Sequence, residues 1–146
     1  MDKTAFDRIA ALLEAQRFAV LCTSTDGWPY AGLVAFYAEP DLKTICVATP
    51  RNTRKTANLC ADGRVALLVD DRSNSEQDCQ QGMAVTVLGR AEILPDDRRQ
   101  RYTPAYLEKH PNLKPFLESS ETVMVRIAVQ QYRLVEQFQS TTDLRP

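Results

Sequence analysis

Three cations stand close together in the segment ATPRNTRKTANL, residues 48 to 59. Arg51, Arg54 and Lys55 follow an apolar run and occupy the predicted start of a short helix, which Asn52 or Thr53 would cap. The helix macrodipole is positive at this end, so each exposed cation in the first turn costs about 0.3 to 1 kcal/mol relative to an anion. The arrangement therefore indicates a missing negative charge.

Three explanations compete for these cations. They form a solvated cluster, or they pair with Asp70 and Asp71 at the end of a later predicted strand, where exposed pairs contribute only about 0 to 1 kcal/mol each. The third explanation is a bound phosphate, held by helix-start N–H groups, the cations and the hydroxyls of Thr49 and Thr53 through charge-assisted bonds of roughly 1.5 to 3 kcal/mol. The phosphate accounts for most of these residue types. GxGxxG and GxxxxGK are absent, so the ligand must be held in another way.

Composition excludes several classes of protein. The 146 residues carry 18 Lys and Arg against 19 Asp and Glu, a net charge of -1, so no broad basic field is available for a nucleic acid. No apolar run approaches the roughly 18 residues of a membrane span, and the first residues do not read as a signal peptide. We therefore expect a single cytoplasmic domain covering residues 1–146.

The residues that most often bind metals or act as nucleophiles are sparse. Cys22, Cys46, Cys60 and Cys79 match no zinc-ligand spacing, and His110 is the only histidine. We expect reduced thiols, no metal site, and no catalytic cysteine paired with a histidine base.

The elements that must position the cations are mostly strands. We predict an N-terminal helix (1–16), a hairpin turning at Asp26 and Gly27, and a bulge or bend at Gly89. The pattern predicts strands at 18–25, 29–37, 44–49, 64–70, 83–94 and 122–138, helices after Thr53 and at 96–109, a polar loop at 71–82 and a polar tail at 139–146. This order is not βαβα alternation, so we predict a mainly β fold, an antiparallel barrel with peripheral helices.

Four features, in order, resemble the FMN-binding split-barrel family related to pyridoxamine 5'-phosphate oxidase, particularly its small flavoprotein members. They are FAVLCTSTDGWPYAGLVAFY with the helix before it, ATPRNTRKTANL, DGRVALLVD and VLGRAEIL, which together cover about residues 4 to 94. The resemblance implies a six-stranded antiparallel split β-barrel that binds FMN non-covalently. It also implies a homodimer with flavin sites at the subunit interface, and a small-molecule substrate that the sequence does not identify.

By this resemblance, Arg54 and Lys55 are the FMN phosphate ligands, with Thr49 and Thr53 as hydroxyl donors. The backbone of Leu33, Val34 and Ala35 would flank the isoalloxazine ring. In the loop at 71–82, Asn74 is our best candidate for a further cofactor contact. Trp28 and Tyr30 fit either ligand stacking or cross-strand packing.

The sequence also departs from the vitamin-salvage oxidases of this family. It lacks their Arg-x-His pair near the C-terminus, and Ala84 stands where they carry a flavin-contacting glutamine. We therefore do not expect pyridoxamine phosphate oxidation and assign no catalytic residue. A flavin-dependent oxidase or reductase is the leading hypothesis. A haem-handling or deazaflavin-using relative and a non-enzymatic flavin-binding protein stay open.

Overall fold

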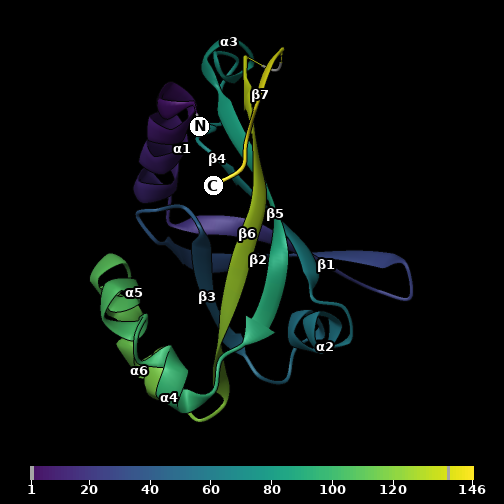
Figure 1. The fold of residues 1–146 in the computed structure, drawn as a ribbon, viewed down its shortest axis with the longest axis vertical. Helices are drawn as coiled ribbons and strands as arrows, with labels where there is room; N and C mark the ends of the chain where they lie inside the picture. The colour runs from purple at the N-terminus through teal and green to yellow at the C-terminus, as the bar shows by residue number, and fades with distance from the viewer. Residues whose placement is uncertain (1, 138) are drawn as a thin grey trace.

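A computed structural model describes residues 2–137 and 139–146 as a mainly antiparallel β structure with peripheral helices (Figure 1). The strands are β1 (Phe18–Thr25), β2 (Trp28–Ala38), β3 (Thr44–Pro50), β4 (Arg64–Asp70), β5 (Met83–Ile93), β6 (Thr122–Glu136) and β7 (Ser140–Leu144). The helices are α1 (Lys3–Ala15), α2 (Arg54–Ala61), α3 (Asp78–Gln81), α4 (Asp96–Arg99), α5 (Thr103–Lys109), the 3-10 helix η1 (Pro111–Leu113) and α6 (Lys114–Glu118). None of the helices in the described part of the chain has both the length and the apolar character of a membrane span.

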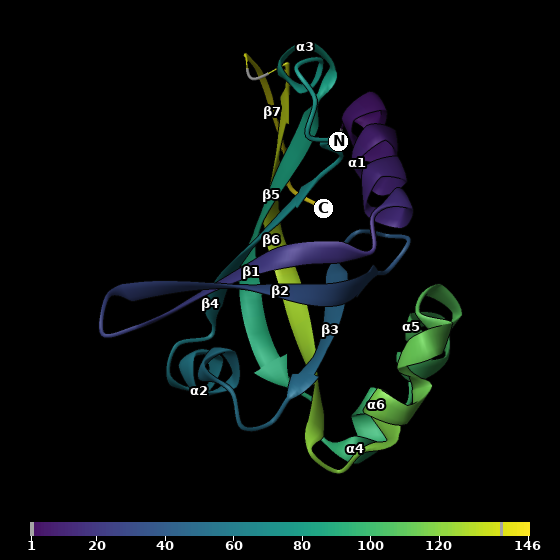
Figure 2. The same ribbon diagram turned by 180° about the vertical axis from the view of Figure 1, so that it is seen from behind.

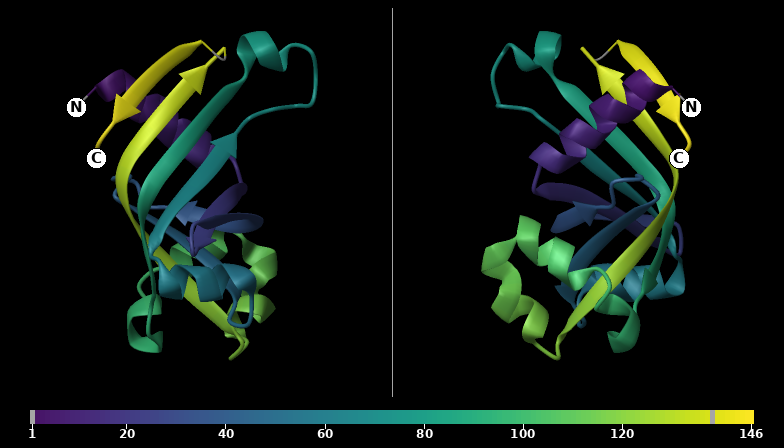
Figure 3. Two further views of the ribbon diagram at one scale, coloured as in Figure 1. Left: turned by 90° about the vertical axis from the view of Figure 1, so that its right-hand side faces the viewer. Right: turned by 60° about the vertical axis from the view of Figure 1, so that its left-hand side comes forward.

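The first six strands close into a barrel, as predicted. Their order is β3-β2-β1-β4-β5-β6, and every pairing is antiparallel. The ring closes where β3 pairs with β6, from Thr44 opposite Ala128 to Pro50 opposite Thr122. β7 pairs with β6 outside this ring, and Figure 3 shows the two strands running side by side.

Alternation along the strands separates the core from the outer surface. In β1, Ala19 and Leu21 point into the barrel while Phe18 is exposed. β3 is buried on both faces: Val47 belongs to the barrel core, and Cys46 belongs to a second apolar cluster with residues of α5 and α6. This double burial explains the nearly continuous apolar run of β3.

Two helices lie at opposite ends of the barrel, α1 at one and α2 at the other (Figures 1 and 2). α1 buries Ile9, Leu12 and Leu13 in the main core, and α2 contributes Leu59 to the same core. The hairpin of β1 and β2 extends sideways past α2, so the start of that helix lies beside a protruding pair of strands.

The helix predicted at 96–109 is wrong as one element, because the chain forms α4 and then α5. Pro104 is the physical reason. A proline inside a continuous helix has no N–H to donate, and its ring clashes with the carbonyl four residues earlier. In the structure Pro104 instead occupies the first turn of a new helix, where both problems disappear.

Two segments predicted to be irregular contain regular structure. The polar tail predicted at 139–146 includes β7, where Asp143 forms a bidentate ion pair with Arg133 at 2.8 and 3.0 Å and Leu144 is buried. The predicted loop at 71–82 includes the short helix α3. Polar composition concealed both elements, since β7 gains its order from pairing with β6 rather than from its own apolar pattern.

Candidate functional site

The first turn of α2 carries the cations. Of the two predicted capping residues, Asn52 and Thr53, the structure has Thr53 as the N-cap. Its Oγ1 accepts a hydrogen bond from the Thr56 N–H at 3.2 Å. The Thr56 hydroxyl donates to the Pro50 carbonyl at 2.9 Å, which ties the helix start to the end of β3. The first N–H groups of any helix lack intrahelical acceptors and point outward. This helix start therefore presents donors beside two cations.

Arg54 and Lys55 lie against β2. A Cβ added at Gly32 would approach Lys55 Cδ to 2.9 Å, so the lysine stem crosses the strand where no side chain obstructs it. The Arg54 guanidinium lies 5.7 Å from the centre of the Tyr30 ring. The structure thus brings the two predicted phosphate ligands together beside the strand that was predicted to flank the flavin.

Internal carboxylates do not neutralise these two cations. Asp70 pairs with Arg72 at 3.0 Å, and the Asp71 carboxylate accepts from the Met83 N–H at 2.8 Å. Within residues 2–137 and 139–146, neither Arg54 nor Lys55 forms an ion pair. Pairing with Asp70 and Asp71 is therefore the wrong explanation.

Arg51 belongs to a different neighbourhood. Its guanidinium donates to the Ser120 carbonyl at 3.4 Å, and its backbone N–H donates to the carbonyl of Glu121. These contacts attach Arg51 to the turn before β6, so we do not group it with Arg54 and Lys55.

Thr49 is buried deeply in β3. It is 1% exposed, and its Oγ1 has no hydrogen-bond partner among the described residues. A buried hydroxyl without a partner costs about 1 to 3 kcal/mol. The hydroxyl is thus available to a polar group that reaches it, and its predicted contact with a phosphate stays a prediction.

The three residues of β2 predicted to flank the isoalloxazine ring, Leu33, Val34 and Ala35, differ in their exposure to solvent. Leu33 is 69% exposed, whereas Val34 is buried in the core and Ala35 is half-buried. The Ala35 carbonyl accepts a hydrogen bond from the Tyr106 hydroxyl of α5 at 3.0 Å. The open part of this strand therefore lies at Leu33, and α5 covers the part beyond it.

Leu33 belongs to an exposed apolar face on the outside of the barrel. Val20 pairs with Leu33 on one side and with Leu68 on the other. We call the exposed side chains of this face the outer apolar face; they are Phe18, Leu33, Leu68 and Leu88. Exposed apolar side chains on one face of a sheet make that face a candidate contact surface.

Asn74 lies far from α2 within its own chain. Its N–H donates to the Asp78 carboxylate at 2.9 Å, and the N–H groups of Ser73 and Ser75 donate to the same carboxylate. These bonds, with those of Ser73 first, lower the pKa of Asp78. Asp78 begins α3, which stands at the opposite end of the molecule from α2 in Figures 1 and 2. One chain alone does not bring Asn74 to the cations.

Sequence reasoning missed a buried polar contact beneath α2. The Asn58 side-chain amide donates to Thr23 Oγ1 at 3.1 Å and accepts from the Thr25 hydroxyl at 2.6 Å. Asn58 is 4% exposed and Thr23 is 2% exposed. Asparagine is a poor helix former, so its presence inside a short helix was the available signal.

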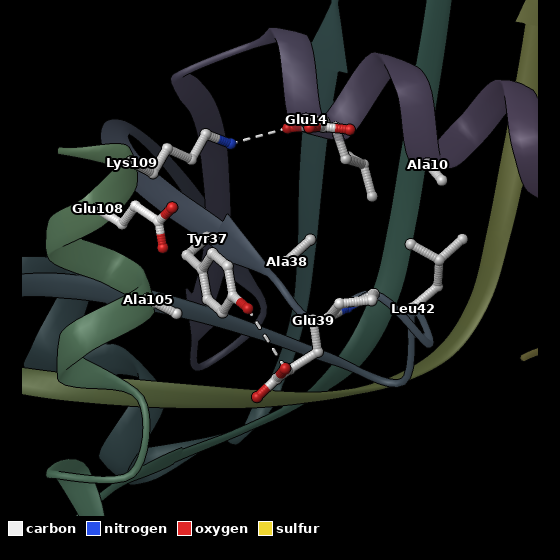
Figure 4. Close-up of a pocket in the computed structure, with 11 residues that line it drawn as sticks. Ala10, Glu14, Tyr37, Ala38, Glu39, Leu42, Ala105, Glu108 and Lys109 are labelled. Atoms are coloured by element: carbon white, nitrogen blue, oxygen red, sulfur yellow. Dashed lines mark hydrogen bonds between the residues drawn. The ribbon is translucent and has the colours of Figure 1, made fainter.

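A separate cavity of about 480 Å³ lies between α1, the turn joining β2 to β3, and α5 (Figure 4). Lys109 lines it, and its Nζ donates to the Leu13 carbonyl at 2.8 Å and lies 4.0 Å from the centre of the Phe36 ring. Burial and the neighbouring Arg17 lower the pKa of Lys109 to about 8, against the opposing effect of Glu14. This lysine joins α5 to the last turn of α1.

His110 and Cys46 are buried and engaged in the core, whereas Cys60 and Cys79 are exposed free thiols. His110 Nε2 lies 2.7 Å from the Phe36 carbonyl, and burial lowers the pKa of the imidazole. Burial likewise raises the pKa of the Cys46 thiol to about 12, which keeps it protonated and non-nucleophilic. The described residues contain no group of three or more His, Cys, Asp or Glu side chains that could hold a metal ion.

Solved structures with the same fold are numerous. The general stress protein 26 from Bacillus anthracis is 21% identical with a TM-score of 0.71, and the match covers 97% of this chain and 98% of that one. A FAD-binding protein from Mesorhizobium loti is 20% identical with a TM-score of 0.70, covering 92% and 94%. A haem-binding protein from Mycobacterium smegmatis is 18% identical with a TM-score of 0.85; the match covers 99% of this chain but 59% of that one. At these identities the similarity establishes the fold alone.

Sequence comparison identifies the family. No curated protein matches the sequence. The family model for pyridoxamine 5'-phosphate oxidase matches residues 5–136, which include the barrel strands β1 to β6 and the cations of α2. The chain belongs to the pyridoxamine 5'-phosphate oxidase family.

Proposed function

We propose that the protein binds FMN non-covalently and acts as a flavin-dependent oxidase or reductase. One observation carries the proposal: Arg54 and Lys55 stand at the start of α2, beside an exposed part of β2, without a carboxylate partner among the described residues. A phosphate at a helix N-terminus satisfies both the cations and the outward N–H groups. The family match and the FAD-binding structural relative support a flavin as the bearer of that phosphate.

The residues at α2 fit a phosphate. Arg54 and Lys55 would hold its charge, as the family resemblance implies. Thr49 offers a hydroxyl that has no hydrogen-bond partner in the described part of the chain, and Thr53 offers one that already caps the helix. We expect Thr53 to contribute mainly by fixing the helix start.

The remainder of the flavin would lie along β2. Leu33 is the open position, while Val34 and Ala35 would contribute through the backbone. Because Asn74 lies at the other end of its own chain, it would reach a flavin only from a second copy. Bound flavin supplies the transfer of hydride or single electrons, and the protein supplies binding, orientation and exclusion of water. His110 and Cys46 are tied up in the core, so we assign neither as an acid or base.

The first experiment is a flavin titration with matched ligands. Wild-type protein should purify yellow, release FMN identifiable by mass, and bind FMN more tightly than riboflavin, which lacks the phosphate. The double variant Arg54→Ala, Lys55→Ala should lose at least about 100-fold in FMN affinity, because two charge-assisted bonds are removed, with little change for riboflavin. Equal FMN affinity in both proteins would overturn the phosphate site.

We also propose a homodimer in which a second copy covers the outer apolar face and completes two flavin sites. Asp70 and Arg72 border this face and pair with each other within one chain at 3.0 Å, so the same face of a second copy would meet no net charge there across a two-fold axis. Leu33→Asp places a charge in the face and should give a monomer by sedimentation equilibrium. Asn112→Asp adds the same charge at an exposed position in η1 and should leave the dimer intact. A wild-type monomer at micromolar concentration contradicts the proposal.

Haem is the second candidate, because one structural relative binds it. The chain's single histidine is a poor axial ligand here, since its Nε2 is engaged with the Phe36 carbonyl inside the core. A Soret band in the purified protein would nevertheless show that the bound cofactor is haem rather than flavin. A deazaflavin would be distinguished by the mass of the released cofactor.

We further propose that the protein works in the cytoplasm. All four cysteines are free thiols, which suits a reducing compartment. Recovery in the cytosolic fraction of cells would agree with this, and recovery in an oxidising compartment would contradict it.

A further inference from the structure

The contact between Asn58 and β1 is more polar than packing requires. Both halves of the Asn58 amide are used, one by Thr23 and one by Thr25. Apolar burial would hold a helix to a sheet without direction, whereas hydrogen bonds fix distance and angle. A fully satisfied buried polar network specifies one arrangement of its elements. Asn58, Thr23 and Thr25, which we call the Asn58 triad, therefore fix the orientation of α2 relative to β1.

This arrangement determines where the cations point. Asn58 follows Arg54 by four residues and Lys55 by three, so all three lie along neighbouring parts of the helix surface. On the other side, the Thr56 hydroxyl ties the helix start to Pro50. With both attachments, α2 can neither rotate nor slide along the hairpin without breaking a hydrogen bond.

We propose that Asn58, Thr23 and Thr25 are positioning residues for the phosphate-binding cations. They hold α2 at the rotation that lays the Lys55 stem across Gly32. This inference rests on the proposed FMN site. If the triad is removed, Lys55 and its partner cation stay in the protein but lose their common alignment, and binding sites tolerate little such displacement.

The ratio of FMN affinity to riboflavin affinity isolates this effect, because the two flavins differ only by the phosphate. Both affinities can be measured by quenching of flavin fluorescence on full-length variants. Thr25→Val removes the hydroxyl at nearly constant volume and should lower the ratio about tenfold, the equivalent of one charge-assisted bond. Thr25→Ser keeps the hydroxyl and should retain the ratio. Asn58→Ala should lower it at least as far as Thr25→Val.

A control for general destabilisation is available on the α1 side of the barrel. Tyr132→Phe removes a buried hydrogen bond to the Leu42 carbonyl, 2.7 Å long, without touching α2. It should lower the urea midpoint and leave the flavin ratio unchanged. If Asn58→Ala does not fold, the two Thr25 variants decide the question.

The possible failures are distinguishable. Equal wild-type affinities for FMN and riboflavin would overturn the proposed phosphate site itself. A high wild-type ratio that Thr25→Val leaves unchanged would overturn the positioning role alone. An equal fall in Tyr132→Phe would show that lost stability, rather than alignment, causes the effect.

Discussion

Lys55 and Lys109 both reach from a helix onto β2, yet their surroundings are opposite. Lys109 of α5 is used internally, since its amine donates to the Leu13 carbonyl and lies over the Phe36 ring. Lys55 of α2 lies over Gly32, and its amine makes no hydrogen bond or ion pair within the described residues. Lys109 therefore stabilises the contact between two helices, whereas Lys55 is positioned by the strand on which it packs.

The difference shows how a cation can be ordered without being neutralised. Packing orders the aliphatic stem of Lys55 on a strand that lacks a side chain at that point, which leaves its ammonium group for a ligand. Lys109 has no such freedom, because its hydrogen bond joins two helices. Both lysines lie beside β2, so this position does not tell a ligand-binding lysine from a structural one. The hydrogen-bond partner of the amine does.

The larger test of this contrast is Gly32→Ala. The added methyl group would lie 2.9 Å from Lys55 Cδ, so the flexible lysine must move while the strand backbone stays in place. We expect FMN affinity to fall about tenfold, and stability to change by no more than about 0.5 kcal/mol. Calorimetric FMN titration and urea denaturation measure the two quantities. Unchanged FMN affinity would mean that the position of Lys55 is unimportant.

The smaller test is the pH dependence of Lys109→Met. Folding lowers the pKa of Lys109 from 10.5 to about 8, so between these values the unfolded chain binds more protons than the folded one. Wild-type stability should therefore rise relative to the variant from pH 8 to 10.5 and run parallel to it below pH 8. Allowing for solvent around the half-buried amine, we expect a relative rise of about 1 kcal/mol. Denaturant midpoints at unit pH intervals would measure it, and parallel curves across the whole range would contradict it.

Local patterns predicted much of the fold. The strands at 18–25 and 64–70 match β1 and β4 residue for residue. The irregularity predicted at Gly89 is confirmed as a register shift between Leu88 and Gly89, but the extra residue is Gln130 of the partner strand β6. A Cβ at Gly89 would lie 2.5 Å from the Ala128 carbonyl. Turn chemistry and alternation are short-range signals, so one sequence was enough.

Long-range contacts escaped the same reasoning. Spacing placed Arg54 and Lys55 at a helix start, but the contact with Gly32 depends on how α2 sits on the hairpin. Asn58 likewise contacts Thr25, which lies 33 positions earlier in the sequence, and Thr23, which lies 35 positions earlier. No periodicity within a single segment encodes such distances, which explains why the cations were predicted and the residues that aim them were not.

The pairing of β3 with β6 also constrains the order in which the protein can form. Thr44 pairs with Ala128, so the seam that closes the barrel includes residues separated by more than half of the 146 positions. Such distant pairing pays the entropy of loop closure before it gains any contacts, which slows folding. The contacts that orient Arg54 and Lys55 involve only residues 23–58, so they can form during synthesis before β6 leaves the ribosome and the barrel closes.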